Sequence, residues 1–119
     1  MMGALAMTVL IFVSTECPVS NRYAPEIKRL HEEFAMRGVR FRLVYPNPLD
    51  DEAAVSELAR RADVLIENFK PGGMTRFGLG YDQVSETNPG IVYASITGFG
   101  SGAGRHVPGY DLMVQAISG

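Results

Sequence analysis

The sequence predicts an α/β fold: a small open parallel sheet of about four strands with helices packed on its faces, in three layers α/β/α. Three observations predict it. Short apolar runs rich in Val and Ile recur along the chain, and segments with the apolar spacing of a helix separate them. Gly, Pro and Asn cluster where one element gives way to the next. Because strand–helix–strand crossovers are nearly always right-handed, this alternation indicates parallel strands.

The composition is that of one globular domain, with 46% hydrophobic and 20% charged residues in a chain of 119. The 11 Lys and Arg residues face 13 Asp and Glu residues, so no basic excess indicates a nucleic acid or an anionic membrane as partner. The apolar residues 1–13 are fewer than the roughly 20 that span a bilayer, and they lack the features of a secretory signal. Cys17 is the single cysteine, which excludes an intrachain disulfide and a multi-cysteine zinc site. We therefore expect a cytoplasmic protein without a metal ion.

The first half of the chain predicts a strand–helix–strand unit. The apolar run 8–13 and the alternating run 39–45 (VRFRLVY) are typical of strands. Between them, residues 18–36 have the spacing of an amphipathic helix, and Gly38 is a suitable stop. The residues expected to face the core are Tyr23, Ile27, Leu30 and Phe34. Those expected to form a solvated face are Lys28, Arg29, Glu32 and Glu33.

The second half continues the alternation. Residues 50–61 begin with Asp and contain good helix formers, and residues 62–67 (ADVLIE) follow as a third strand. A loop over 68–73 leads to a helical stretch that Gly78 and Gly80 interrupt. Further along, we expect a fourth strand at 91–96, a Gly-rich loop at 98–109 and a last helix at 110–117.

Residues 58–119 resemble the family III CoA-transferases, the group that contains the formyl-CoA and carnitine-CoA transferases. The resemblance is carried by the segments RADVLIENFKPGGMTRFGLGYDQVSETNPGIVYASITGFG and PGYDLMVQAISG, as four blocks in the right order. It implies a transferase that moves CoA from an acyl-CoA to a carboxylate, with CoA or acyl-CoA as its ligand.

The loop over 68–73 is the candidate ligand site. In open α/β sheets ligands bind outside the carboxyl ends of the strands, and this loop follows the third strand. Glycines allow close approach to the backbone, and free amides and positive side chains favour phosphate. The resemblance implies that the family contacts CoA at the positions of Asn68, Phe69, Lys70, Gly72 and Arg76. For each residue taken alone, the alternative is a turn former or a solvated charge.

The last block contains Asp111, which the resemblance implies lies near the transferase site. The alternative is an acidic residue at a helix start that interacts with the helix dipole. Tyr110 stands where the racemase branch of the family has a catalytic histidine, which favours transferase over racemase. In the family the nucleophilic aspartate lies beyond these blocks, so we expect an incomplete, inactive fragment with at most weak CoA binding.

Residues 8–48 resemble a different family, the thioredoxin-like redoxins, in their first strand–helix–strand unit. The resemblance rests on VLIFVSTECPVSNRYAPEIKRLHEEFAMRGVRFRLVYPNP, with Cys17 at the strand-to-helix turn. A helix start stabilises a thiolate, so a monothiol redox protein using Cys17 is one alternative function. Ser20 stands where a dithiol enzyme has its second cysteine. A buried, idle Cys17 is the other interpretation.

The two resemblances meet near residue 57, so residues 1–57 and 58–119 are predicted to be two segments packed as one α/β domain. The chain would then be a chimera or a fragment. A non-catalytic interaction module is the third functional alternative. Unpaired sheet edges would also favour association into a homo-oligomer.

Overall fold

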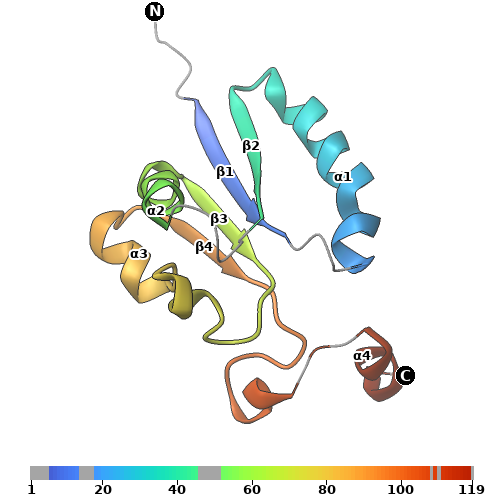
Figure 1. Cartoon of the computed structure of the whole chain (residues 1–119). Helices are drawn as coiled ribbons and strands as arrows, with labels where there is room; N and C mark the ends of the chain where they lie inside the picture. Colours follow the sequence, from blue (N-terminus) through green and yellow to red (C-terminus); the bar gives the residue numbers. More distant parts are fainter. Residues whose placement is uncertain (1–5, 14–17, 46–51, 108, 110, 119) are drawn as a thin grey trace, which may run out of the picture.

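Strands and helices alternate along the chain as expected (Figure 1). The structure is a computed structural model that describes residues 6–13, 18–45, 52–107, 109 and 111–118. The strands are β1 (Met7–Phe12), β2 (Val39–Val44), β3 (Val64–Glu67) and β4 (Val92–Ser95). The helices are α1 (Pro18–Ala35), α2 (Glu52–Arg61), α3 (Tyr81–Thr87) and α4 (Asp111–Ser118), and the two 3-10 turns are η1 (Met74–Phe77) and η2 (Ala103–His106).

The four strands form one parallel sheet in the order β2-β1-β3-β4, which confirms the predicted fold class. Strand β1 is central: Leu10 is in register with Arg42 of β2 on one side and with Leu65 of β3 on the other. The two halves of the chain therefore contribute strands to the same sheet.

The strand order and the handedness rule determine which face each helix covers. The step from β1 to β2 runs in one direction across the sheet, and the steps from β2 to β3 and from β3 to β4 run in the other. Right-handed crossovers then put α1 on one face and both α2 and α3 on the opposite face. Figure 1 shows this arrangement, with the sheet between α1 and the α2–α3 pair.

The hydrophobic core lies between the sheet and the α2–α3 pair. Leu10, Phe12 and Leu65 point to this face and are almost completely buried. Residues from α2, η1 and α3 pack over them, together with Leu79 and Ile91 from the connections. The core residues from the three covering elements are Ala59, Met74 and Val84.

The opposite face is only partly covered. Helix α1 contacts the edge strand β2, and its side chains Ile27, Leu30 and Phe34 are half-buried. Tyr23, expected in the core, is 59% exposed, so that prediction was wrong. An 18-residue helix is about 27 Å long, whereas a six-residue strand spans about 20 Å, so the helix extends beyond the strand that it covers.

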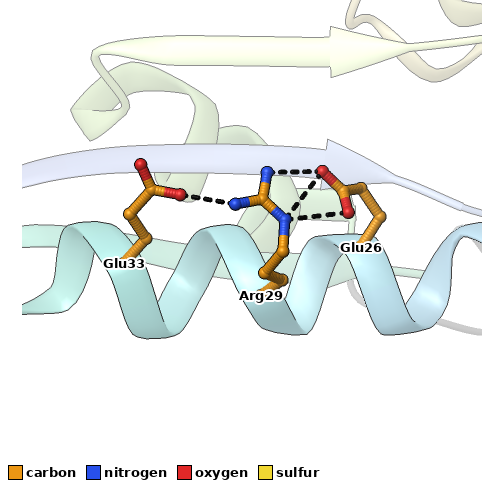
Figure 2. Close-up of polar contacts among 3 residues, drawn as sticks. All are labelled: Glu26, Arg29 and Glu33. Atoms are coloured by element: carbon orange, nitrogen blue, oxygen red, sulfur yellow. Dashed lines mark hydrogen bonds and ion pairs between the residues drawn. The ribbon is translucent and has the colours of Figure 1, made fainter.

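The outer face of α1 carries the solvated charges that the sequence indicates. Figure 2 shows Arg29 between two glutamates of the same helix. Its Nη2 lies 2.6 Å from Glu26 Oε1 and its Nη1 lies 2.6 Å from Glu33 Oε2. The hydrogen bond from Arg29 lowers the pKa of Glu26. Exposed pairs of this kind contribute little to stability, because solvent and salt screen them.

The predicted interruption between residues 74 and 87 is present. Gly78 adopts a left-handed conformation, with φ 69°, which ends the 3-10 turn η1 before α3 begins at Tyr81. Among the described helices, none has the length and apolar character needed to cross a membrane.

Candidate functional site

The loops that follow β3 and β4 leave the sheet at the same side, the carboxyl ends of the strands, because these two strands are parallel neighbours. Glu67, the last residue of β3, is in register with Ser95, the last residue of β4. The Ile96 N–H donates to the Glu67 carbonyl oxygen at 2.9 Å, which keeps the two strand ends together. The segments that follow both strands run along the lower edge of the sheet in Figure 1. This is the edge at which open α/β sheets bind ligands.

The loop over 68–73 is a tight turn that is fixed at both ends. The Phe69 ring packs against the core, so this residue anchors the loop. The Gly73 N–H donates to the Lys70 carbonyl oxygen at 2.7 Å, and Gly72 between them has φ 81°. A Cβ on Gly73 would lie 2.9 Å from the same carbonyl oxygen, so the turn needs glycine there.

Three of the predicted CoA contacts are exposed on this turn: Asn68, Lys70 and Gly72. Phe69 is half-buried and faces the core, so its role in the fold is that of an anchor. Lys70 makes no ion pair with any residue that the structure describes. Its positive charge is therefore free to meet an anion.

Arg76 lies in η1, directly after the loop. Met74 at the start of this turn is buried, and the Leu79 N–H donates to the Met74 carbonyl oxygen at 3.0 Å. Arg76 itself is exposed and, like Lys70, has no ion-pair partner in the described part of the chain. One unpaired cation thus lies in the turn and another directly after it, and the backbone of Gly72 between them is exposed.

Glu67 is the functional candidate that the sequence reasoning missed. Its side chain is 6% exposed and is the only buried charged one among the described residues. Oε2 accepts the Phe69 N–H at 2.7 Å, and Oε1 accepts a hydrogen bond from the Ser95 hydroxyl. Burial and the Glu67 charge raise the pKa of Tyr93 to about 12. An acidic residue that ends an otherwise apolar strand was the signal in the sequence.

The Gly-rich loop after β4 folds back on itself. A Cβ on Gly104 would lie 2.8 Å from the Phe99 Cβ, and one on Gly109 would lie 2.9 Å from the Gly98 backbone. Gly100 has φ 72°, and its N–H donates to the Thr97 hydroxyl at 2.9 Å. The glycines here serve backbone packing within the loop.

Two predicted functional residues have side chains outside the described part of the structure. Asp111 is the first residue of α4, but its side chain lies outside the described part of the structure. Cys17 lies outside the described residues altogether. Among the residues that are described, no group of three or more His, Cys, Asp or Glu side chains could hold a metal ion.

Comparisons with known proteins concern most of the chain. The profile of CoA-transferase family III matches residues 46–119. The chain is 41% identical over 103 residues to the acetyl-CoA:oxalate CoA-transferase of Acetobacter aceti, a match that covers 84% of this chain and 26% of that protein. It is 49% identical over 65 residues to the formyl-CoA:oxalate CoA-transferase of Streptomyces coelicolor, which covers 55% of this chain and 16% of that protein.

A solved structure agrees with these matches. The crystal structure of a CAIB/BAIF family protein from Brucella suis is 40% identical, with a TM-score of 0.56 over 67% of this chain and 21% of that one. The chain thus spans about a quarter or less of these proteins.

The relative from Acetobacter aceti bears on the N-terminal half too, since a match over 84% of the chain must include part of residues 1–57. None of these matches supports a thioredoxin-like segment. The profile match over residues 46–119, more than half of the sequence, shows that this chain belongs to CoA-transferase family III.

Proposed function

We propose that this chain binds CoA or an acyl-CoA through the turn at 68–73 and Arg76, as the ligand-binding part of an acyl-CoA:carboxylate CoA-transferase. The proposal depends on one observation. Lys70 and Arg76, two exposed cations without an ion-pair partner in the described residues, lie in and directly after the turn at 68–73, where Gly72 is exposed at the carboxyl edge of the sheet. The relatives named above are CoA-transferases with oxalate as one substrate, which supports a small carboxylate as the acceptor.

The chemistry of CoA suits this arrangement. Its phosphates need positive charge and hydrogen-bond donors, and a guanidinium supplies both in a fixed planar geometry. Gly72 has no side chain to keep a phosphate or the pantetheine arm from the backbone. Asn68 adds an exposed amide that can donate or accept a hydrogen bond.

Binding of CoA to the 119-residue chain, measured by calorimetry or ligand-detected NMR, tests the proposal. We expect Arg76→Ala to weaken CoA binding about tenfold, because one charge-assisted hydrogen bond contributes about 1.5–3 kcal/mol and 1.4 kcal/mol is a factor of ten. Pantetheine, which lacks the phosphates, should not distinguish the variant from the wild type.

Arg61→Ala is the matched control. Arg61 is also an exposed arginine, but it ends α2 at the opposite edge of the sheet and pairs with Glu57 at 3.2 Å. It should leave CoA binding unchanged. No binding by the wild type at millimolar CoA, or equal binding by Arg76→Ala, would contradict the proposal.

The same samples test the remaining alternatives. We expect these 119 residues alone to bind without transferring CoA, because the resemblance puts the nucleophilic aspartate outside the matched blocks. Measurable transfer would direct attention to Asp111. Rapid alkylation of Cys17 at neutral pH would favour the monothiol alternative instead. If neither CoA binding nor a reactive thiol is found, an interaction module is the better interpretation.

A further inference from the structure

The Glu67 carboxylate lies at the point where β3 becomes the candidate CoA loop. It shares a face of the sheet with Leu65 and is buried, although a buried carboxylate is costly unless hydrogen bonds satisfy it. No cation among the described residues pairs with it. Its stabilisation in the described structure therefore comes from hydrogen bonds.

The two carboxylate oxygens have different partners. Oε2 accepts the N–H of Phe69, two residues further along, at 2.7 Å, which turns the chain sharply after the strand. Oε1 accepts the hydroxyl of Ser95 on the neighbouring strand β4. One side chain thus connects the loop, the end of β3 and the end of β4.

The bond to Phe69 restrains the start of the loop. The Phe69 N–H donates to the Glu67 carboxylate, and the Phe69 ring packs against the core. Asn68, which lies between Glu67 and Phe69 in the chain, is exposed. The Lys70–Gly73 turn follows directly. A loop that is already ordered loses less conformational freedom when a ligand binds.

We propose that Glu67 is a positioning residue for the CoA loop: through its hydrogen bonds to Phe69 N–H and Ser95 Oγ it orders residues 68–73 for ligand binding. The ligand part of this inference rests on the proposed CoA-binding function. Glu67 acts through the positions of its two oxygens and not through its charge, because both oxygens accept hydrogen bonds from groups of this chain. The groups that contact the ligand are Lys70 and Arg76.

Three variants separate geometry from charge. Glu67→Gln keeps an oxygen for the Phe69 N–H and gains an amide that can donate to the Ser95 hydroxyl, so both contacts survive without the charge. Glu67→Ala removes both contacts. Ser95→Ala removes one contact at an exposed residue, and it keeps the test decisive if Glu67→Ala does not fold. Glu86→Ala, an exposed glutamate of α3, is the control for loss of a carboxylate.

Two measurements on the 119-residue chain decide the matter: CoA affinity, and hydrogen exchange of the Phe69 amide with the Leu65 amide as a core reference. We expect Glu67→Ala to weaken CoA binding about tenfold and to speed Phe69 exchange about tenfold relative to Leu65. Ser95→Ala should have smaller effects in the same direction. Glu67→Gln and Glu86→Ala should stay within about threefold of the wild type in both.

Three outcomes would overturn the inference. They are an unchanged Phe69 amide in both Glu67→Ala and Ser95→Ala, equal acceleration at Phe69 and Leu65, and a loss in Glu67→Gln as large as in Glu67→Ala. If the wild type binds no CoA, the proposed function fails and the ligand part of this inference fails with it. The exchange data then still decide whether Glu67 orders the loop.

Discussion

At the scale of single residues, Glu67 and Tyr93 are coupled across the sheet. Tyr93 is half-buried, and its hydroxyl donates to the Leu79 carbonyl oxygen at 2.8 Å. Its ring meets Tyr81 edge to face, with centroids 5.9 Å apart. Burial, and secondly the negative charge of Glu67, disfavours the phenolate and raises the Tyr93 pKa to about 12. The Tyr93 pKa therefore depends on whether residue 67 carries a negative charge.

This pKa has a consequence for stability at high pH. The folded pKa of Tyr93, about 12, lies above the ordinary value of about 10, so folding favours the neutral phenol. Its contribution is complete below about pH 10 and is lost as the pH rises toward about 12. We expect Tyr93→Phe to lack this part of the pH dependence of unfolding.

The check is a 13C titration of the tyrosine ring carbons, with Tyr93→Phe to assign the Tyr93 signal. The wild-type Tyr93 Cζ should titrate near pH 12, well above the ordinary tyrosine value of about 10. In Glu67→Gln the Tyr93 pKa should fall, because one of its two causes is removed. A Tyr93 midpoint near 10 in the wild type would contradict the prediction.

At the scale of elements, a single side chain joins the ends of α2 and α3. Asn88 directly follows α3, and its amide donates to the carbonyl oxygens of Ala59, at 3.1 Å, and Ala62, at 2.8 Å. These carbonyls lie at the end of α2, where backbone acceptors lack helical partners. These two hydrogen bonds connect the carboxyl end of α2 to the end of α3.

We expect Asn88→Ala to destabilise the protein by about 1–3 kcal/mol, since it removes the donor to the Ala62 carbonyl oxygen and leaves the Ala59 carbonyl oxygen with only the 3.4 Å hydrogen bond from the Ala62 N–H. Denaturant unfolding followed by circular dichroism measures the change. Asn21→Ala, at an exposed position in α1, is the control and should leave stability unchanged or slightly raised. Equal effects of the two substitutions would show that the bonds from Asn88 contribute little.

At the scale of the whole molecule, helices cover one face of the sheet more completely than the other. The α2–α3 face holds the core, whereas Met7, Leu43 and Val92 are exposed on the face that α1 shares. Val92 is in register with Val64 at the β4 edge, away from the β2 strand that α1 contacts. An exposed apolar sheet surface of this kind favours association with another molecule.

A pair of large-to-small substitutions tests the asymmetry. Leu10→Ala, at a side chain with 0% exposure, should cost about 2–5 kcal/mol, because it removes buried surface and leaves a cavity. Val92→Ala, at 60% exposure, should stay within about 0.5 kcal/mol. Unfolding midpoints at two protein concentrations provide the measurement. A large, concentration-dependent loss for Val92→Ala would mean that another copy covers this face.

Much of the fold was predictable because its signals are local. Apolar runs, helical spacing and glycine stops indicate the elements, and the handedness of crossovers then limits the topology. Tyr23 was placed wrongly because helical periodicity says which side chains share a face but not how far the partner strand reaches. The thioredoxin-like interpretation of residues 8–48 rested on one βαβ unit, a pattern that many α/β proteins share, and on Cys17 at its strand-to-helix turn.

By itself the sequence determined the four parallel strands, their alternation with helices and the family resemblance of residues 58–119, because each depends on residue type and spacing along the chain. Only the tertiary structure decided that β1 lies between β2 and β3, that Ser95 meets Glu67, and that Lys70 and Arg76 have no ion-pair partner in the described residues. These facts depend on contacts between residues far apart in sequence. Such contacts follow from how whole elements pack, and no local pattern specifies them.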